Sequence, residues 1–84
     1  MEYAVFTPKQ LAQALKGWRK NRMLTQADAA GQVGLRPKTI SALESKPETS
    51  TLSSFFKLLS ALDLELVLRD KSKGAAGKSH SGEW

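Results

Sequence analysis

The segment from residue 24 to residue 44, LTQADAAGQVGLRPKTISALE, constrains the fold most, because its residues stand where two short helices joined by a tight turn need them. Ala30 is small enough for a second helix to cross close above it, and Gly34 can take the positive φ that the turn demands. Ile40 is expected to be buried under the second helix. The spacing predicts one helix over about residues 26–33 and another over about residues 37–45.

Both of these helices begin at residues that suit a helix start. Thr25 can cap the first helix, and Asp28, three residues further on, can complete a capping box. Pro37 suits the first turn of the second helix, where the missing N–H of proline costs nothing.

The same segment resembles the helix-turn-helix of the lambda-repressor and Cro type, with Gln26 opening the first helix and an Ile-Ser-x-x-Glu pattern in the second. The resemblance covers roughly residues 8–62. It implies a mostly α, lambda-repressor-like bundle of four to five helices that binds double-stranded DNA. The alternative is an all-helical domain with the same packing and no DNA partner.

The distribution of charge favours the DNA-binding interpretation. Between residues 16 and 46, seven basic side chains stand against two acidic ones, and the resulting net charge of +5 equals that of the whole chain. Such an asymmetry favours a polyanionic partner. The basic residues are Lys16, Arg19, Lys20, Arg22, Arg36, Lys38 and Lys46.

Two further helices are expected on either side of this segment. Thr7 and Pro8 predict a helix that ends near Asn21. Its core positions at helical spacing are Leu11, Leu15 and Trp18. From Thr51 onward an i, i+3, i+4, i+7 pattern predicts a fourth amphipathic helix, with its aromatic pair in the core. The residues of this pattern are Leu52, Phe55, Phe56, Leu59 and Leu62.

After the fourth helix the apolar period changes to that of a strand, because leucines alternate with Glu65 and Val67. One short strand has no partner within the chain, so we expect it to pair with its copy across the twofold axis of a homodimer. The predicted dimer contacts are Leu64, Leu66, Val67 and Leu68. The alternative is that residues 64–68 extend the fourth helix. Residues 1–70 would thus form one DNA-binding and dimerisation domain.

Residues 71–84, KSKGAAGKSHSGEW, carry too little apolar surface to offset the entropy of ordering, so a disordered tail is predicted. Trp84 cannot reach the core from this tail, but a large aromatic side chain suits a pocket on a partner protein. The alternative is an accidental terminal residue.

A second resemblance rests on TPKQLAQALKGWR, TLSSFFKLLSALDLEL and the final EW, which are similar to the HipB family of antitoxins from HipBA toxin–antitoxin pairs. The resemblance implies a homodimer that represses its own operon through palindromic operators. It also implies neutralisation of a HipA-like serine/threonine-type kinase, with Glu83 and Trp84 in the toxin contact.

The resemblance to these repressors places the base contacts at the start and on the exposed face of the second helix-turn-helix helix, at Arg36, Pro37, Lys38 and Ser41. Pro37 departs from the pattern, because such repressors often carry a base-reading glutamine there, and readout at Pro37 is reduced to shape and apolar contact. A phosphate contact is expected at Gln26, because its backbone N–H lies at the N-terminus of a helix, where anions are favoured. Further phosphate contacts are expected at Thr25, Thr39 and Lys46.

Other classes of function find little support in the sequence. Paired carboxylates, a nucleophile with its base, and cysteine are missing, so we expect no enzyme, metal site, cofactor or small-molecule substrate. Apolar runs are too short for a bilayer and the first residues do not resemble a signal peptide, so a cytoplasmic, nucleoid-associated bacterial protein without a membrane partner is expected. Three interpretations remain: an autorepressing antitoxin, a phage-type repressor without a protein partner, and an interaction adaptor that does not bind DNA.

Overall fold

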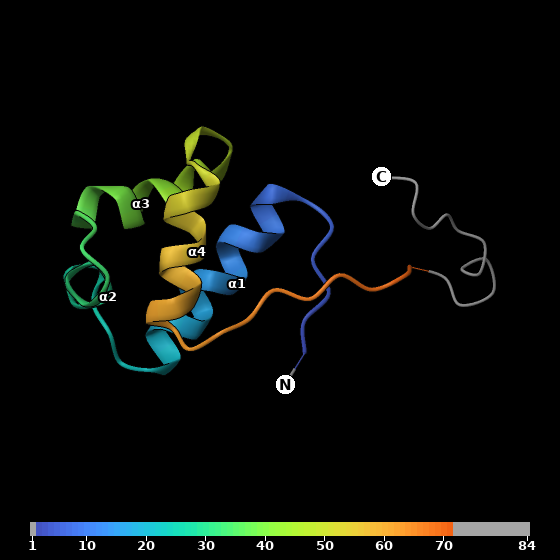
Figure 1. Cartoon of the computed structure of the whole chain (residues 1–84), viewed down its shortest axis with the longest axis horizontal. Helices are drawn as coiled ribbons and strands as arrows, with labels where there is room; N and C mark the ends of the chain where they lie inside the picture. The colour runs from blue at the N-terminus through green and yellow to red at the C-terminus, as the bar shows by residue number, and fades with distance from the viewer. Residues whose placement is uncertain (1, 72–84) are drawn as a thin grey trace.

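The computed structural model describes residues 2–71, which form a bundle of α-helices (Figure 1). In chain order the elements are α1 (Pro8–Asn21), α2 (Gln26–Gln32), α3 (Pro37–Ser45), the short 3₁₀ helix η1 (Pro47–Thr49) and α4 (Leu52–Ala61). No β-strand occurs within residues 2–71. The predicted helical bundle is therefore confirmed, with four α-helices.

Three threonine caps set the starts of α1, α2 and α4. Each threonine hydroxyl accepts a hydrogen bond from the backbone N–H three residues further on, at 3.1 Å for Thr7, 3.0 Å for Thr25 and 3.0 Å for Thr51. Asp28 completes the predicted capping box, because its carboxylate accepts from the Thr25 N–H at 2.9 Å. Each cap is worth about 1 kcal/mol of stability. Pro37 occupies the first turn of α3, as predicted.

The turn between α2 and α3 depends on the backbone of Gly34. Its φ is +70°, and a Cβ built at this position would meet nothing within 4 Å. The requirement for glycine is therefore conformational rather than steric. The Leu35 N–H closes the turn on the Ala30 carbonyl at 2.9 Å, and the methyl group of Ala30 is buried where the helices meet. Both expectations for this turn are confirmed.

The core lies between α4 and the other three helices (Figure 1). Ile40, Leu58 and Leu62 are its largest fully buried side chains. Leu15 is buried with them, and Leu11 and Trp18 pack against this cluster while partly exposed. The prediction that these three residues of α1 face the core is thus confirmed, although only Leu15 is fully covered.

The prediction for α4 was wrong at two positions, since Leu52 is 73% exposed and Phe56 is 47% exposed. Only Phe55 of the aromatic pair is buried, and its ring meets that of Phe56 at a centroid distance of 5.3 Å. Leu58, which the pattern did not single out, is fully buried. The apolar arc of α4 is wider than the surface that α1–α3 offer it, so one edge of the arc stays uncovered.

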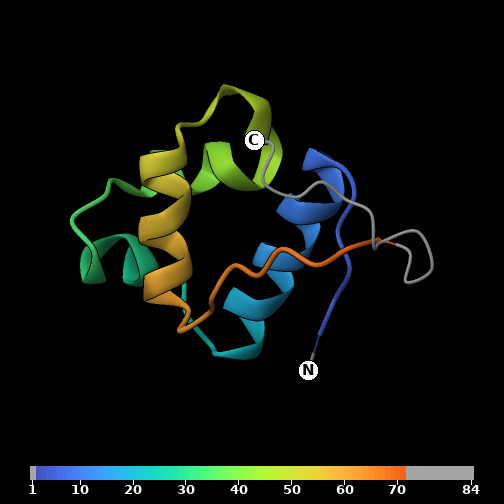
Figure 2. The same ribbon diagram turned by 45° about the vertical axis from the view of Figure 1, so that its right-hand side comes forward.

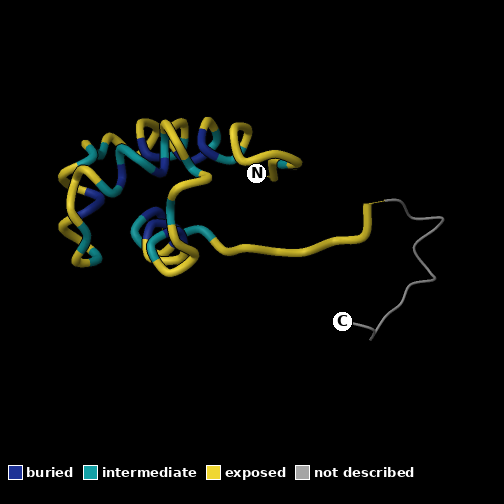
Figure 3. The backbone as a smooth tube through the Cα atoms, turned by 90° about the horizontal axis from the view of Figure 1, so that it is seen from above, coloured by how far each residue is buried: buried dark blue, intermediate teal, exposed yellow. Residues whose placement is uncertain are grey.

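The end of α4 excludes the alternative in which residues 64–68 continue this helix. Asp63 adopts φ +59°, the Leu64 N–H donates to the Leu59 carbonyl at 2.8 Å, and the Asp63 N–H donates to the Ser60 carbonyl at 3.1 Å. These two bonds are those of a Schellman motif, which terminates a helix. Residues 64–70 then run without helical or strand assignment and are mostly exposed (Figure 3).

This last segment passes beside the N-terminal segment in both side views (Figures 1 and 2). Arg69 reaches Glu2 at 3.1 Å, and the Lys71 ammonium lies 5.7 Å from the centre of the Phe6 ring. The two ends of the described chain are therefore neighbours.

Candidate nucleic-acid interface

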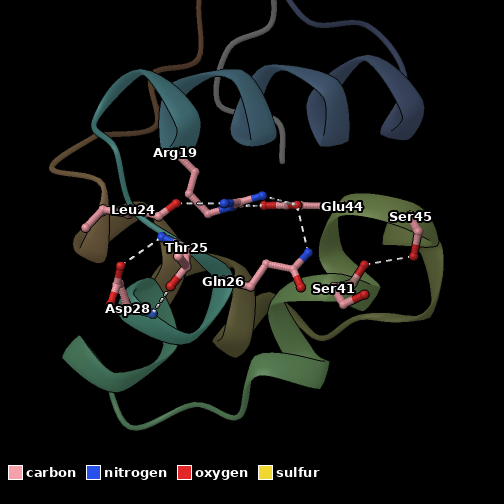
Figure 4. Close-up of polar contacts among 8 residues, drawn as sticks. All are labelled: Arg19, Leu24, Thr25, Gln26, Asp28, Ser41, Glu44 and Ser45. Atoms are coloured by element: carbon pink, nitrogen blue, oxygen red, sulfur yellow. Dashed lines mark hydrogen bonds and ion pairs between the residues drawn. The ribbon is translucent and has the colours of Figure 1, made fainter.

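Three of the four predicted base-reading residues lie together at the N-terminus of α3. Arg36 is the N-cap residue, Pro37 and Lys38 follow in the first turn, and all three are exposed. The Arg36 side chain makes no capping hydrogen bond, so its guanidinium is not committed to the helix. Ser41 lies about one turn further on and is half-buried; its carbonyl accepts from the Ser45 hydroxyl at 2.8 Å (Figure 4). The geometry groups two cations on one exposed helix end.

The predicted phosphate-contacting residues are distributed over two helices. Thr25 and Gln26 open α2, and Thr39 is half-buried in α3. Lys46 follows the last residue of α3, at the end opposite Arg36. Because a nine-residue helix is about 13 Å long, the structure separates Lys46 from the base-reading end.

A buried polar network holds the three helices of this region in place (Figure 4). The Arg19 guanidinium donates to both carboxylate oxygens of Glu44, at 2.6 and 3.0 Å, and to the Leu24 carbonyl at 2.7 Å. The Gln26 amide donates to Glu44 Oε1 at 3.1 Å. Since Arg19 belongs to α1, Gln26 to α2 and Glu44 to α3, one carboxylate joins all three helices.

The network corrects one part of the charge interpretation. The Arg19 side chain is only 8% exposed and is paired with Glu44, so it does not belong to the cationic surface. The other six basic residues between positions 16 and 46 are exposed, and only Asp28 opposes them. The local excess of +5 is therefore preserved, because Arg19 and Glu44 neutralise each other. Glu44 is the one acidic residue of a helix that has a cationic start, and this was the sequence signal from which a buried ion pair could have been predicted.

The ionisation of Glu44 reflects the balance in this network. Burial raises the pKa of Glu44, but the hydrogen bonds from Arg19 and Gln26 and the charge of Arg19 outweigh burial and hold the pKa below its usual value. The hydrogen bond to Glu44 raises the pKa of Arg19. In α2, the backbone N–H and then the hydroxyl of Thr25 lower the pKa of Asp28. Glu44 is therefore an anion at neutral pH, as the network requires.

The predicted dimer contacts lie on the segment after α4. Leu64 is half-buried against the core, whereas Leu66, Val67 and Leu68 are 51%, 65% and 85% exposed. The structure contains a single chain, so their pairing remains a prediction. Glu83 and Trp84, the predicted toxin contacts, lie outside the described residues.

Residues 2–71 show neither a cluster of metal-ligating side chains nor a membrane-spanning helix. These residues contain no group of three or more His, Cys, Asp or Glu side chains that could hold a metal ion. Within the same range, no helix has the length and apolar character needed to cross a membrane.

Two short helices that meet at a glycine turn, with an exposed cationic start to the second, define a helix-turn-helix protein. A helix-turn-helix family model matches residues 15–68. The chain is 39% identical over 75 residues to antitoxin HipB from Escherichia coli K12, covering 89% of this chain and 84% of the relative. It is 34% identical over 82 residues to antitoxin HipB from Escherichia coli O6:H1, covering 95% and 87%.

Solved structures give the same result. One neighbour is a HipB variant in complex with an O2 20mer, with a TM-score of 0.82, 38% identity and coverage of 86% of this chain and 100% of that chain. Another is a complex of HipA, HipB and O2–O3, with a TM-score of 0.81, 37% identity and coverage of 84% and 100%. The chain belongs to the HipB family of helix-turn-helix antitoxins.

Proposed function

We propose that this protein is an antitoxin and autorepressor that binds palindromic operator DNA as a homodimer and neutralises a HipA-like serine/threonine-type kinase. The observation that carries the DNA part is the exposed cationic start of α3, held in place by the buried Arg19–Glu44–Gln26 network. The solved relatives named as complexes of HipB with O2 and with HipA support both partners.

In this proposal the start of α3 enters the major groove of the operator. Arg36 and Lys38 would donate hydrogen bonds to O6 and N7 of guanine bases. Ser41 would extend the contact with the bases by one helical turn. Each good side-chain contact of this kind discriminates between bases by about 1–3 kcal/mol. Pro37 offers shape and apolar contact only. Two such helix ends in a dimer would account for a specific operator.

Phosphate contacts would fix the register of the protein on the duplex. Gln26 gives one amide hydrogen to Glu44, which orients its side chain and leaves the other hydrogen for a phosphate oxygen. The Thr25 hydroxyl already accepts from the Asp28 N–H and retains its own O–H as a donor. Thr39 and Lys46 complete the proposed set.

The proposed dimer forms through residues 64–68. Their extended path leaves Leu66, Val67 and Leu68 exposed, and pairing with a second copy would cover these side chains and give the backbone its hydrogen-bond partners. Such a dimer would place its two α3 helices about 34 Å apart, or a multiple of that, to match an inverted repeat. The proposed toxin contact is made by Glu83 and Trp84. Binding to DNA would associate the protein with the bacterial nucleoid in the cytoplasm.

Binding to a duplex that carries the operator of the chain's own operon tests the DNA part. We expect Lys38→Glu to abolish measurable specific binding in fluorescence anisotropy, because it reverses a charge at the start of α3. Lys57→Glu makes the same change on α4, outside the helix-turn-helix, and should have little effect. Equal losses in both variants would point to non-specific attraction. A wild-type chain that binds the kinase and ignores duplex DNA would instead support an adaptor, and binding to DNA alone would support a stand-alone repressor.

A further inference from the structure

An apolar groove opens between the N-terminal segment, α1 and the start of α4, on residues that the proposed DNA contacts do not use. Its volume is about 350 Å³. The lining is mainly apolar and includes Val5, Phe6, Leu11, Leu15, Leu52 and Phe55. The volume falls within the range of about 300–1,000 Å³ that is usual for pockets that bind small ligands.

Two features of the groove indicate an aromatic occupant with a hydrogen-bond donor. Leu52 and Phe6 are 73% and 66% exposed at its wall, so a large apolar side chain could cover them. Ser50 also lines the groove, and its buried hydroxyl oxygen has no hydrogen-bond partner among the described residues; a rotation of this side chain would turn the hydroxyl toward an occupant. An indole offers apolar area together with one N–H donor, and a tryptophan N–H usually finds a partner when it is buried.

The described chain ends beside this groove. Lys71 lies with its ammonium 5.7 Å from the centre of the Phe6 ring, and Phe6 is part of the groove wall. Thirteen residues follow Lys71, and Trp84 is the only large apolar residue among them. We propose that the groove binds the indole of Trp84 from the same chain.

The length of the intervening chain permits this contact. A flexible chain of 13 residues has a root-mean-square span of roughly 20 Å, and the starting point at Lys71 is already at the mouth. A short flexible connection gives an effective concentration in the millimolar range, so even an intrinsically weak site is substantially occupied.

Docking would withhold Trp84 from the toxin, a consequence that rests on the proposed function. The apparent affinity of a partner falls in proportion to the fraction of chains that are competent to bind it. A groove occupied two-thirds of the time would thus weaken the tail contact with the kinase about threefold. The docked state is a property of the free antitoxin, so it can be measured without any toxin.

Acrylamide quenching of Trp84 fluorescence in the full chain tests the proposal. Trp18→Phe leaves Trp84 as the only tryptophan. In this background we expect Leu52→Lys, which replaces an exposed wall residue, to raise the quenching constant. A rise of about threefold would correspond to a groove that is occupied two-thirds of the time in the parent chain. Met23→Lys makes the same kind of change at a side chain 87% exposed and outside the groove, and should change nothing.

A second variant guards against a folding defect. Phe6→Ala removes another exposed wall residue and should raise the quenching constant of Trp84 in the same way, with circular dichroism confirming the helices of each variant. A Trp84 that is already fully accessible in the Trp18→Phe protein would overturn the proposal. Protection that survives both Leu52→Lys and Phe6→Ala would also overturn it.

A mixed sample separates docking within one chain from docking onto a second copy. Chains with Trp18→Phe and Leu52→Lys carry Trp84 and a blocked groove; chains with Trp18→Phe and Trp84→Ala carry an open groove and no tryptophan. After refolding the two together with the second in excess, we expect Trp84 to stay accessible. Protection of Trp84 in this mixture would place it in the groove of another copy and refute docking onto its own chain.

Discussion

Arg19 and Glu44, which are 25 residues apart in the sequence, form a two-bond ion pair between the last turns of α1 and α3. Their side chains are 8% and 4% exposed, so water contributes little to either charge. Gln26 and the Leu24 carbonyl supply the remaining partners. The helix whose cationic start we propose to read DNA is thus held against α1 by a buried, neutralised pair.

Removing one member of this pair should destabilise the protein strongly. Arg19→Met leaves the Glu44 carboxylate buried without its cation, and breaking a buried pair in this way costs about 3–5 kcal/mol. Urea unfolding measures the loss. Arg22→Met, at an exposed position one turn away, is the matched control and should cost far less. The double variant Arg19→Met, Glu44→Leu should be more stable than Arg19→Met alone, and purely additive losses would contradict the coupling.

The free energy of unfolding should fall in acid because of Glu44. Its pKa is lowered in the folded state, so its ionised form adds stability that is complete above the unfolded value of about 4.3 and is lost as the pH falls through the folded pKa. Urea titrations from pH 7 downward should show this loss below about pH 4.3. In Glu44→Gln the loss should be smaller. Asp28→Asn is the control, because the pKa of Asp28 is also lowered. If the free energy of unfolding depended on pH in Glu44→Gln as it does in the wild type, Glu44 would be excluded as the cause of the loss.

Arg36 and Lys46 should differ in what they contribute to DNA binding. Arg36→Ala should weaken operator binding by about 1–3 kcal/mol and relax the preference at one base pair. Lys46→Ala should weaken all sequences alike and make the slope of log K against log salt shallower by about 0.9. Anisotropy titrations at several salt concentrations measure both quantities. An unchanged salt slope would remove Lys46 from the phosphate contacts.

Leu66→Lys should break the dimer if residues 64–68 pair across it. Leu66 is 51% exposed in the single chain, so the substitution should leave the fold of each protomer intact while placing two charges in the interface. Sedimentation velocity measures the oligomeric state. Met23→Lys, at an exposed apolar residue distant from this segment in the sequence, should remain dimeric. A fully dimeric Leu66→Lys protein would direct the search to the exposed edge of α4.

Deletion of Trp84 should weaken kinase binding and leave DNA affinity intact. A buried aromatic anchor is typically worth about 2 kcal/mol or more, which corresponds to roughly thirtyfold in the tail contact. The measured loss of kinase affinity for the whole complex will be smaller than this, because the tail loses part of its interaction energy to ordering. The loss will be smaller still if the helical domain also contacts the toxin. Calorimetric titration of full chains with and without Trp84 gives the comparison. Equal kinase affinities would show that Trp84 does not contribute to the toxin contact.

The sequence by itself determined the helix starts and the turn of this protein. Thr7, Thr25 and Thr51 cap helices through bonds that span three residues, and Gly34 meets a backbone requirement of a single residue. Features of this kind depend on neighbours in the chain, so residue type and spacing were sufficient to predict them. The position of Arg36, Pro37 and Lys38 at one helix start followed from the same local signals.

Only the tertiary structure decided which side chains are buried between the helices and which form pairs from one helix to another. The apolar pattern of α4 did not distinguish buried Leu58 from exposed Phe56, because the distinction depends on how much surface the other helices present. The charge pattern likewise counted Arg19 with the cationic surface, although Glu44 neutralises it from another helix. Contacts between residues 25 positions apart depend on the crossing of whole helices, which no local period encodes.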